Sequence, residues 1–251
     1  MESLVKKRRN DRIVKREIHF LEGPQTRQYE FKYLLSVMSE FIKGFRALHF
    51  IGPCVTIFGS ARFKEDHPIY KETRNLASAI AKLGFTIMTG GGPGLMEAAN
   101  RGAKEVGGKS VGCNIVLPRE QSHNAYLDKW VNIKYFFVRK ILLIKYSYAF
   151  VVMPGGFGTL DEFYEAITLI QTRKIEMFPI IIYDKEFYQK VIEHHRNMIA
   201  AGTISPDDER LFIVTDSVDE AIRYIKEKSI AAFGLKYMKP KKPLWALFER
   251  K

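Results

Sequence analysis

Short, almost continuously apolar segments alternate with longer amphipathic segments through most of this 251-residue chain. Such runs are typical of strands buried on both faces, and strands that alternate with helices indicate a parallel sheet covered by helices. The predicted strands span 54–58, 85–88, 110–115, 131–135, 149–153, 180–183 and 211–214, and the predicted helices span roughly 69–83, 93–106, 139–145, 160–170, 191–200 and the residues from 218. We therefore expect a Rossmann-like α/β fold, with a doubly wound parallel sheet and helices on both faces.

An amphipathic segment precedes the first predicted strand. Residues 28–48 carry large apolar side chains at helical spacing, namely Phe31, Leu34, Leu35, Met38, Phe41, Ile42 and Phe45. We predict a helix whose apolar face packs on the body of the protein or on a partner subunit. The chain then divides into a basic N-terminal extension with this helix (1–49), a Rossmann-like domain (50–230) and a basic C-terminal tail (231–251).

The net charge of +12 is concentrated at the two ends of the chain. Residues 1–17 contribute +4 and residues 236–251 contribute +5, which leaves +3 for the body. Terminal charge runs are commonly just solvated, and a loose affinity for phosphate or RNA is the alternative. We therefore do not expect nucleic acid to be the main partner.

Cysteine content and hydropathy bear on the compartment. Cys54 and Cys113 are the two cysteines, and both lie in apolar stretches, so the chain is not a disulfide-stapled secreted scaffold. No apolar run approaches the roughly 18 residues of a membrane span, and no apolar signal core follows the basic N-terminus. We expect a cytoplasmic protein without a membrane partner.

Three glycine-bearing loops each follow a predicted strand and lead into a predicted helix. They are the first glycine loop (59–60), the second glycine loop (90–94) and the third glycine loop (155–159). In a parallel sheet such loops meet at the carboxyl edge, where ligands bind. Glycines let a ligand approach the backbone, and amides at a helix N-terminus favour a phosphate. The pattern predicts an anionic ligand, although each loop taken alone could be a bare turn.

The third glycine loop matches neither of the common phosphate-binding fingerprints. Its glycines are too close together for a dinucleotide motif, and no Gly-Lys-Ser/Thr follows, so hydride transfer and ATP hydrolysis are not the first interpretation. The histidines show no zinc spacing. We expect no metal and no cofactor.

Two pairs of polar residues near these loops each have two interpretations. Thr159 and Glu162 have the spacing of a helix capping box. Alternatively, Glu162 faces the ligand cleft from the first turn of the helix, where its carboxylate could orient a water or stabilise positive charge. Arg139 and Lys140 open the preceding helix and are either two surface cations or a ligand clamp, because a helix N-terminus is unfavourable for cations.

These motifs together resemble the LONELY GUY (LOG) family. Residues 154–162 read PGGFGTLDE and match the family's PGGxGTxxE motif. Residues 90–96 and 58–62 resemble its second and first glycine loops, and Arg139-Lys140 falls where the family has its Arg-Lys pair. The resemblance covers roughly residues 50–230, with the motifs in the family's order.

The resemblance implies a phosphoribohydrolase that cleaves the N-glycosidic bond of a nucleoside 5′-monophosphate, with AMP and N6-modified cytokinin nucleotides as the substrate class. It implies Arg139 and Glu162 as the catalytic pair, and a homodimer or larger homo-oligomer with active sites near the subunit interface. Together with the glycine loops it predicts substrate contacts at Gly59, Ser60, Gly91, Gly92, Lys140, Met153, Gly155, Gly156, Gly158, Thr159 and Thr168.

The sequence departs from the family pattern at one place. Phe136-Phe137-Val138 stand where the family usually has Met-His-x before Arg-Lys, so the resemblance does not give the preferred base. The family is also often labelled lysine decarboxylase, but no lysine here lies in a pyridoxal-phosphate signature. A non-catalytic carrier or sensor of a nucleotide or cofactor is the alternative to an enzyme, and nucleic-acid binding through the basic tails is a third hypothesis.

Overall fold

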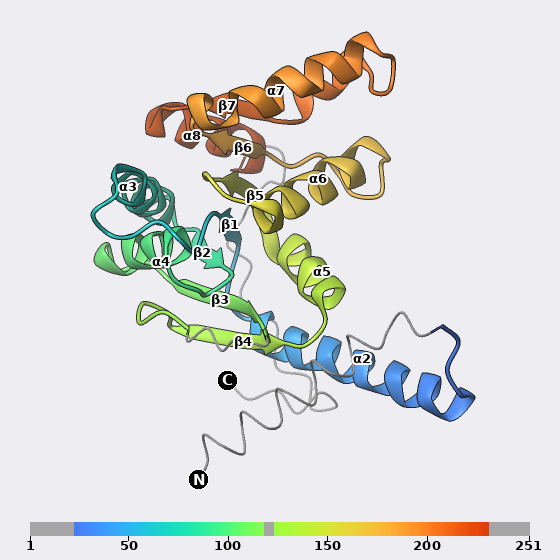
Figure 1. Ribbon diagram of the computed structural model, residues 1–251. Coiled ribbons are helices and arrows are strands. Elements are labelled where there is room, and N and C mark those ends of the chain that lie inside the picture. The colour runs from blue at the N-terminus through green and yellow to red at the C-terminus, as the bar shows by residue number, and fades with distance from the viewer. Residues whose placement is uncertain (1–22, 118–122, 231–251) are drawn as a thin grey trace.

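The computed structural model describes residues 23–117 and 123–230, so both basic tails lie outside the described residues. All strand pairs of its single seven-stranded sheet are parallel, and the strand order is β4-β3-β2-β1-β5-β6-β7 (Figure 1). The strands are β1 (Cys54–Phe58), β2 (Thr86–Thr89), β3 (Ser110–Ile115), β4 (Lys129–Ile133), β5 (Ser147–Val152), β6 (Ile180–Tyr183) and β7 (Ile213–Thr215). The order reverses between β1 and β5, and the loops that follow these two strands border this switch point.

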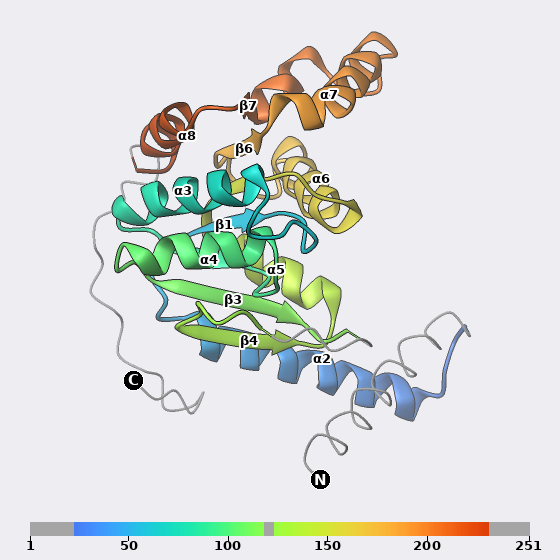
Figure 2. The same ribbon diagram turned by 60° about the vertical axis from the view of Figure 1, so that its left-hand side comes forward.

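Helices cover both faces of the sheet, as Figure 2 shows. One face carries α3 (Pro68–Lys82), α4 (Leu95–Glu105) and α8 (Val218–Ile225), and the other carries α5 (Phe136–Tyr146), α6 (Phe157–Gln171) and α7 (Lys185–Ala200). Two short helices, η2 (Pro206–Leu211) and η3 (Lys226–Ile230), follow α7 and α8. The doubly wound α/β fold is therefore confirmed. The described helices include none that is both long enough and apolar enough to span a membrane.

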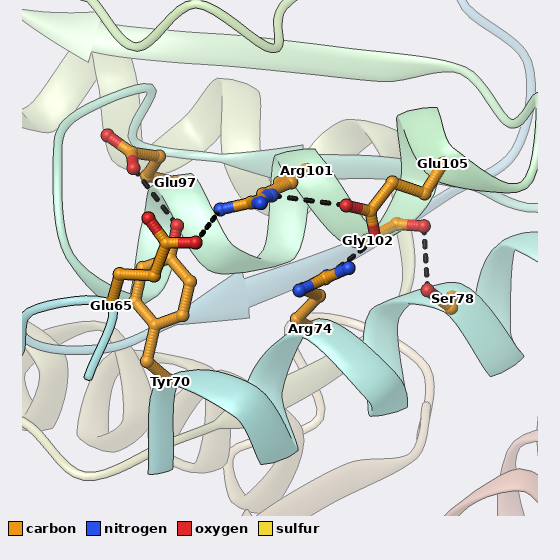
Figure 3. Close-up of polar contacts among 8 residues, drawn as sticks. All are labelled: Glu65, Tyr70, Arg74, Ser78, Glu97, Arg101, Gly102 and Glu105. Atoms are coloured by element: carbon orange, nitrogen blue, oxygen red, sulfur yellow. Dashed lines mark hydrogen bonds and ion pairs between the residues drawn. The ribbon is translucent and has the colours of Figure 1, made fainter. Parts of the chain in front are cut away.

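Close packing of α3 on α4 depends on one glycine. A Cβ atom on Gly102 would overlap the carbonyl oxygen of Arg74, and the Ser78 hydroxyl donates a 2.7 Å hydrogen bond to the carbonyl of Gly102 (Figure 3). The backbones of the two helices can therefore approach each other only because residue 102 has no side chain. Ion pairs and a hydrogen bond line this contact and join Glu65 to Arg101, Arg74 and Arg101 to Glu105, and Tyr70 to Glu97.

The N-terminal helix α2 (Arg27–Leu48) is confirmed, but its apolar residues do not form one packed face. The helix packs on β4 and α5 through the side that includes Gly44 and Leu48, where a Cβ on Gly44 would overlap Leu142. Phe41 and Phe45 also pack on the core. The other apolar residues of the expected face are exposed, namely Phe31, Leu34, Leu35, Met38 and Ile42. Apolar side chains surround more than half of this helix, so one side alone can contact the body.

Candidate functional site

The three glycine loops contact one another at the carboxyl edge of the sheet. The Ser60 N–H donates a 3.0 Å hydrogen bond to the carbonyl of Pro154, which begins the turn into the third glycine loop. The carbonyl of Ser60 accepts a 3.0 Å hydrogen bond from the N–H of Leu95, the first residue of α4. Gly94 has φ +69°, and a Cβ there would lie 2.5 Å from the oxygen of Ser60. The expected meeting of the loops at one edge is therefore confirmed.

The third glycine loop forms the start of α6. Gly156 is the N-cap of this helix, and no side chain of the described residues caps it. A Cβ on Gly155 would overlap the Thr159 side chain, whereas the Cβ positions of Gly156 and Gly158 face open space. Phe157 beside them is 93% exposed. Glycine thus keeps the backbone amides of the first turn accessible to an anion.

The capping-box interpretation of Thr159 and Glu162 is wrong. The helix begins at Phe157, so Thr159 is its third residue and Glu162 its sixth. A capping box needs Thr159 at the N-cap and Glu162 three residues later. Gly156 occupies the N-cap instead, and the Glu162 side chain points to another helix.

Glu162 forms a buried ion pair with Arg139. Nη1 of Arg139 lies 3.1 Å from Oε1 of Glu162, and the two side chains are 13% and 2% exposed. Arg139 is the fourth residue of α5, and its Nε donates a 2.9 Å hydrogen bond to the carbonyl of Cys113 on β3. A Cβ on Gly90, in the second glycine loop, would lie 2.9 Å from Nη2 of Arg139. The guanidinium is therefore confined by a strand, a loop and the carboxylate, and the interpretation as a surface cation is wrong.

The pKa of Glu162 is raised to about 7. Burial raises it by penalising the charged form, while Arg139 and Lys140 act in the opposite direction. The second carboxylate oxygen, Oε2, is buried and accepts no hydrogen bond from the described residues. A carboxyl group that titrates near neutral pH, with one oxygen unpaired, is suited to interact with a developing charge or with a water.

Lys140 lies next to this pair but bonds to other carboxylates. Its Nζ is 2.9 Å from Oδ1 of Asp161 and 3.0 Å from Oε2 of Glu165, and both partners lie on α6. Burial alone would lower the pKa of Lys140, but its hydrogen bond to Asp161 and its ion pair with Glu165 outweigh that effect and raise it. Lys140 therefore links α5 to α6 through two carboxylates, one before and one after Glu162 in the sequence.

One expected substrate contact, Thr168, lies apart from the glycine loops, and another, Met153, lies beside Gly59 but has a buried side chain. Met153 is fully buried in the core on the α3 and α4 side, and its carbonyl accepts a hydrogen bond from Tyr188. Thr168 is six residues beyond Glu162 on α6, about 9 Å along the helix axis. It lines a pocket of about 120 Å³ between α6, α7 and η2, together with His195. Of the loops that hold the other expected contacts, the second lies against Arg139 at Gly90, and the third begins the helix that carries Glu162.

Several residues around the second glycine loop carry no recognisable sequence signal. Thr89, Asn100 and Asn124 come from β2, α4 and the segment before β4, and their side chains meet beneath this loop. Their separation in the sequence conceals the contact, because no local motif joins them. The described residues contain no group of three His, Cys, Asp or Glu side chains that could hold a metal ion.

Comparison with known proteins places this architecture in a family. A family model described as "Possible lysine decarboxylase" matches residues 96–225, more than half of the chain. The cytokinin riboside 5′-monophosphate phosphoribohydrolase of Mycobacterium tuberculosis is 32% identical over 165 residues, which are 62% of this chain and 87% of that protein. The protein of the same name from Rhodococcoides fascians is 26% identical over 179 residues, 68% of this chain and 88% of that protein.

A solved structure shares the fold. The molybdenum cofactor binding protein of Rippkaea orientalis has a TM-score of 0.53 and 22% identity, and the match covers 71% of this chain and 98% of that one. The family model, the relatives and the PGGFGTLDE motif agree with one another. The chain therefore belongs to the family described as possible lysine decarboxylases, that of the LONELY GUY proteins.

Proposed function

We propose that the protein hydrolyses the N-glycosidic bond of a nucleoside 5′-monophosphate, either AMP or an N6-modified cytokinin nucleotide, to the free base and ribose 5-phosphate. The observation that carries this proposal is the buried Arg139–Glu162 pair beside three converging glycine loops. The names of the relatives from Mycobacterium tuberculosis and Rhodococcoides fascians support the same class of reaction.

The phosphate binds to the open amides of the third glycine loop, where Gly156 and Gly158 leave space and the N-terminus of α6 favours an anion. This group is remote from the bond that breaks. Its binding energy holds the ribose in the reactive geometry next to Glu162, six residues into the same helix.

Cleavage of the bond between C1′ and the base leaves positive charge on the sugar in an oxocarbenium-like transition state, as in glycoside hydrolysis. The Glu162 carboxylate stabilises this charge or orients the water that adds to C1′. The electron pair of the broken bond stays with the base, which takes up a proton, and water supplies the hydroxyl of ribose 5-phosphate.

Arg139 acts in this scheme as a fixed cation and hydrogen-bond donor. Its guanidinium is too weak an acid to protonate the leaving base. It holds Glu162 in place through the 3.1 Å contact while the Cys113 carbonyl holds Arg139. We therefore assign to Arg139 the orientation of the carboxylate and of the bound nucleotide.

We also propose that the protein is a cytoplasmic homodimer or larger homo-oligomer. The exposed apolar residues of α2 form a stripe on a helix that already packs on the body through another side. A contiguous exposed apolar patch commonly marks a site of protein–protein interaction. Both cysteines are free and buried, in keeping with a reducing compartment.

A panel of nucleoside 5′-monophosphates, with free base measured by chromatography and ribose 5-phosphate measured enzymatically, tests the proposed reaction. We expect stoichiometric release of the two products from AMP or from an N6-modified analogue. Tight nucleotide binding without any base release would favour the alternative, a carrier or sensor. A carrier does not require a buried carboxyl group that titrates near neutral pH, so the Glu162 environment favours the enzyme.

A further inference from the structure

A buried network of polar side chains lies beneath the second glycine loop. Thr89, Asn100 and Ser110 are fully buried, and Asn124 is nearly so. Oδ1 of Asn100 accepts hydrogen bonds from the Thr89 hydroxyl at 2.7 Å and from Nδ2 of Asn124 at 2.9 Å. Nδ2 of Asn100 donates to the Ser110 hydroxyl at 2.8 Å. Asn100 is therefore the centre of a network that joins α4 to β2, β3 and the segment before β4.

Three further hydrogen bonds connect the network to the backbone of the loop. The Gly91 N–H donates to the Thr89 hydroxyl at 2.9 Å, and Nδ2 of Asn124 donates to the carbonyl of Gly92 at 3.0 Å. The backbone N–H of Asn124 donates to the carbonyl of Gly91 at 2.9 Å. Gly91 itself has φ +74°, a conformation that favours glycine. The position of the loop is thus determined by directional bonds, which apolar packing would not supply.

The held loop lies against the guanidinium of Arg139. A Cβ on Gly90 would lie only 2.9 Å from Nη2 of Arg139, so the loop backbone limits where the guanidinium can move. The guanidinium also contacts the Cys113 carbonyl at 2.9 Å and Glu162 at 3.1 Å. A loop that shifts away would leave Arg139 free to move off the carboxylate.

We propose that Thr89, Asn100 and Asn124 are positioning residues, which hold the second glycine loop against Arg139 and so keep Arg139 on Glu162. The inference rests on the proposed function for its effect on turnover. Its structural part, the control of the Arg139–Glu162 contact by the loop, can be measured without turnover.

Thr89→Val is the direct test, because it removes the hydroxyl group while keeping the shape of the side chain. Thr86→Val is the matched control. Thr86 lies on the same strand, is equally buried, and donates a 2.6 Å hydrogen bond to the carbonyl of Ile51, away from the glycine loops. Thr89→Ser keeps the hydroxyl and serves as the rescue.

We expect kcat of Thr89→Val to fall by about 10- to 100-fold relative to Thr86→Val, with a smaller effect on KM, because sub-ångström misplacement of a catalytic pair has effects of this size. Thr89→Ser should retain kcat close to that of the wild type. Asn124→Leu, which loses the bond to Gly92, should lower kcat in the same way and replaces Thr89→Val if that variant does not fold.

Titration of Glu162 by carbon-13 NMR of its carboxyl group provides the second readout. Arg139 lowers the pKa of Glu162, so a displaced Arg139 should raise the titration midpoint in Thr89→Val and leave it unchanged in Thr86→Val. Equal midpoints and equal losses of kcat in the two variants would overturn the proposal. A shifted midpoint together with no base release by the wild type would support the positioning role and contradict the proposed function.

Discussion

Glu162 is the residue through which pH should control the proposed reaction. Burial raises its pKa to about 7, and only the ionised form can stabilise positive charge on the sugar. We therefore expect kcat/KM to fall about tenfold for each pH unit below 7 and to level off above it. A pH profile between 5 and 9 measures this, and activity that instead falls as the pH rises through 7 would show that the protonated carboxyl acts.

Substitution of Gly158 should weaken ligand binding without lowering the stability of the protein. Its Cβ position faces open space within the first turn of α6, so Gly158→Ala should not clash with the protein. We expect the free energy of unfolding to stay the same or to rise by about 0.5 kcal/mol. The added methyl group would occupy the space where the phosphate approaches, so KM should rise severalfold. An unchanged KM would place the phosphate elsewhere.

The sequence singles out Arg139 and Glu162 but not their surroundings. Glu162 lies in the PGGFGTLDE motif, and Arg139 belongs to a separate Arg-Lys pair. The spacing of Thr159 and Glu162 also fits a capping box, and only the start of α6 at Phe157 excludes that interpretation. The ion pairs of Lys140 and the contacts of Asn100 join distant segments, so no local pattern reports them.

The contact between α3 and α4 should be more sensitive to volume than to charge. A Cβ on Gly102 would overlap the backbone of Arg74, so Gly102→Ala should lower the free energy of unfolding by about 3 kcal/mol. Glu105→Gln, on the same helix, loses partly exposed ion pairs with Arg74 and Arg101 and should cost less than about 1 kcal/mol. Chemical denaturation measures both values, and equal costs would contradict this order.

The sequence predicts the positions of the strands well. It predicts less well where the helices begin and end, and which of their sides pack on the body. Every predicted strand is present within a few residues, because runs buried on both faces are apolar throughout. Helix α7 begins at Lys185, ahead of the predicted 191, since Asp184 caps its first turn. The residues of α2 that pack on the body were only partly predictable, because apolar residues lie on both sides of this helix.

The exposed apolar stripe on α2 should control the oligomeric state of the protein. Met38→Glu places a charge in the middle of the exposed apolar residues, and Ser39→Glu adds the same charge at the next exposed position, outside the stripe. We expect light scattering to show an oligomer for the wild type and for Ser39→Glu, and a shift toward monomer for Met38→Glu. A monomeric wild type would contradict the proposed assembly.

The proposed hydrolysis depends on Glu162 acting as a catalytic residue. The most direct measurement compares the wild type with Glu162→Gln, in base release from the best nucleotide of the panel and in nucleotide binding by calorimetry. We predict that Glu162→Gln folds and binds the nucleotide but loses at least about 100-fold in turnover, the size expected when a group that stabilises transition-state charge is removed. Turnover by Glu162→Gln at the wild-type rate would contradict a catalytic role for Glu162.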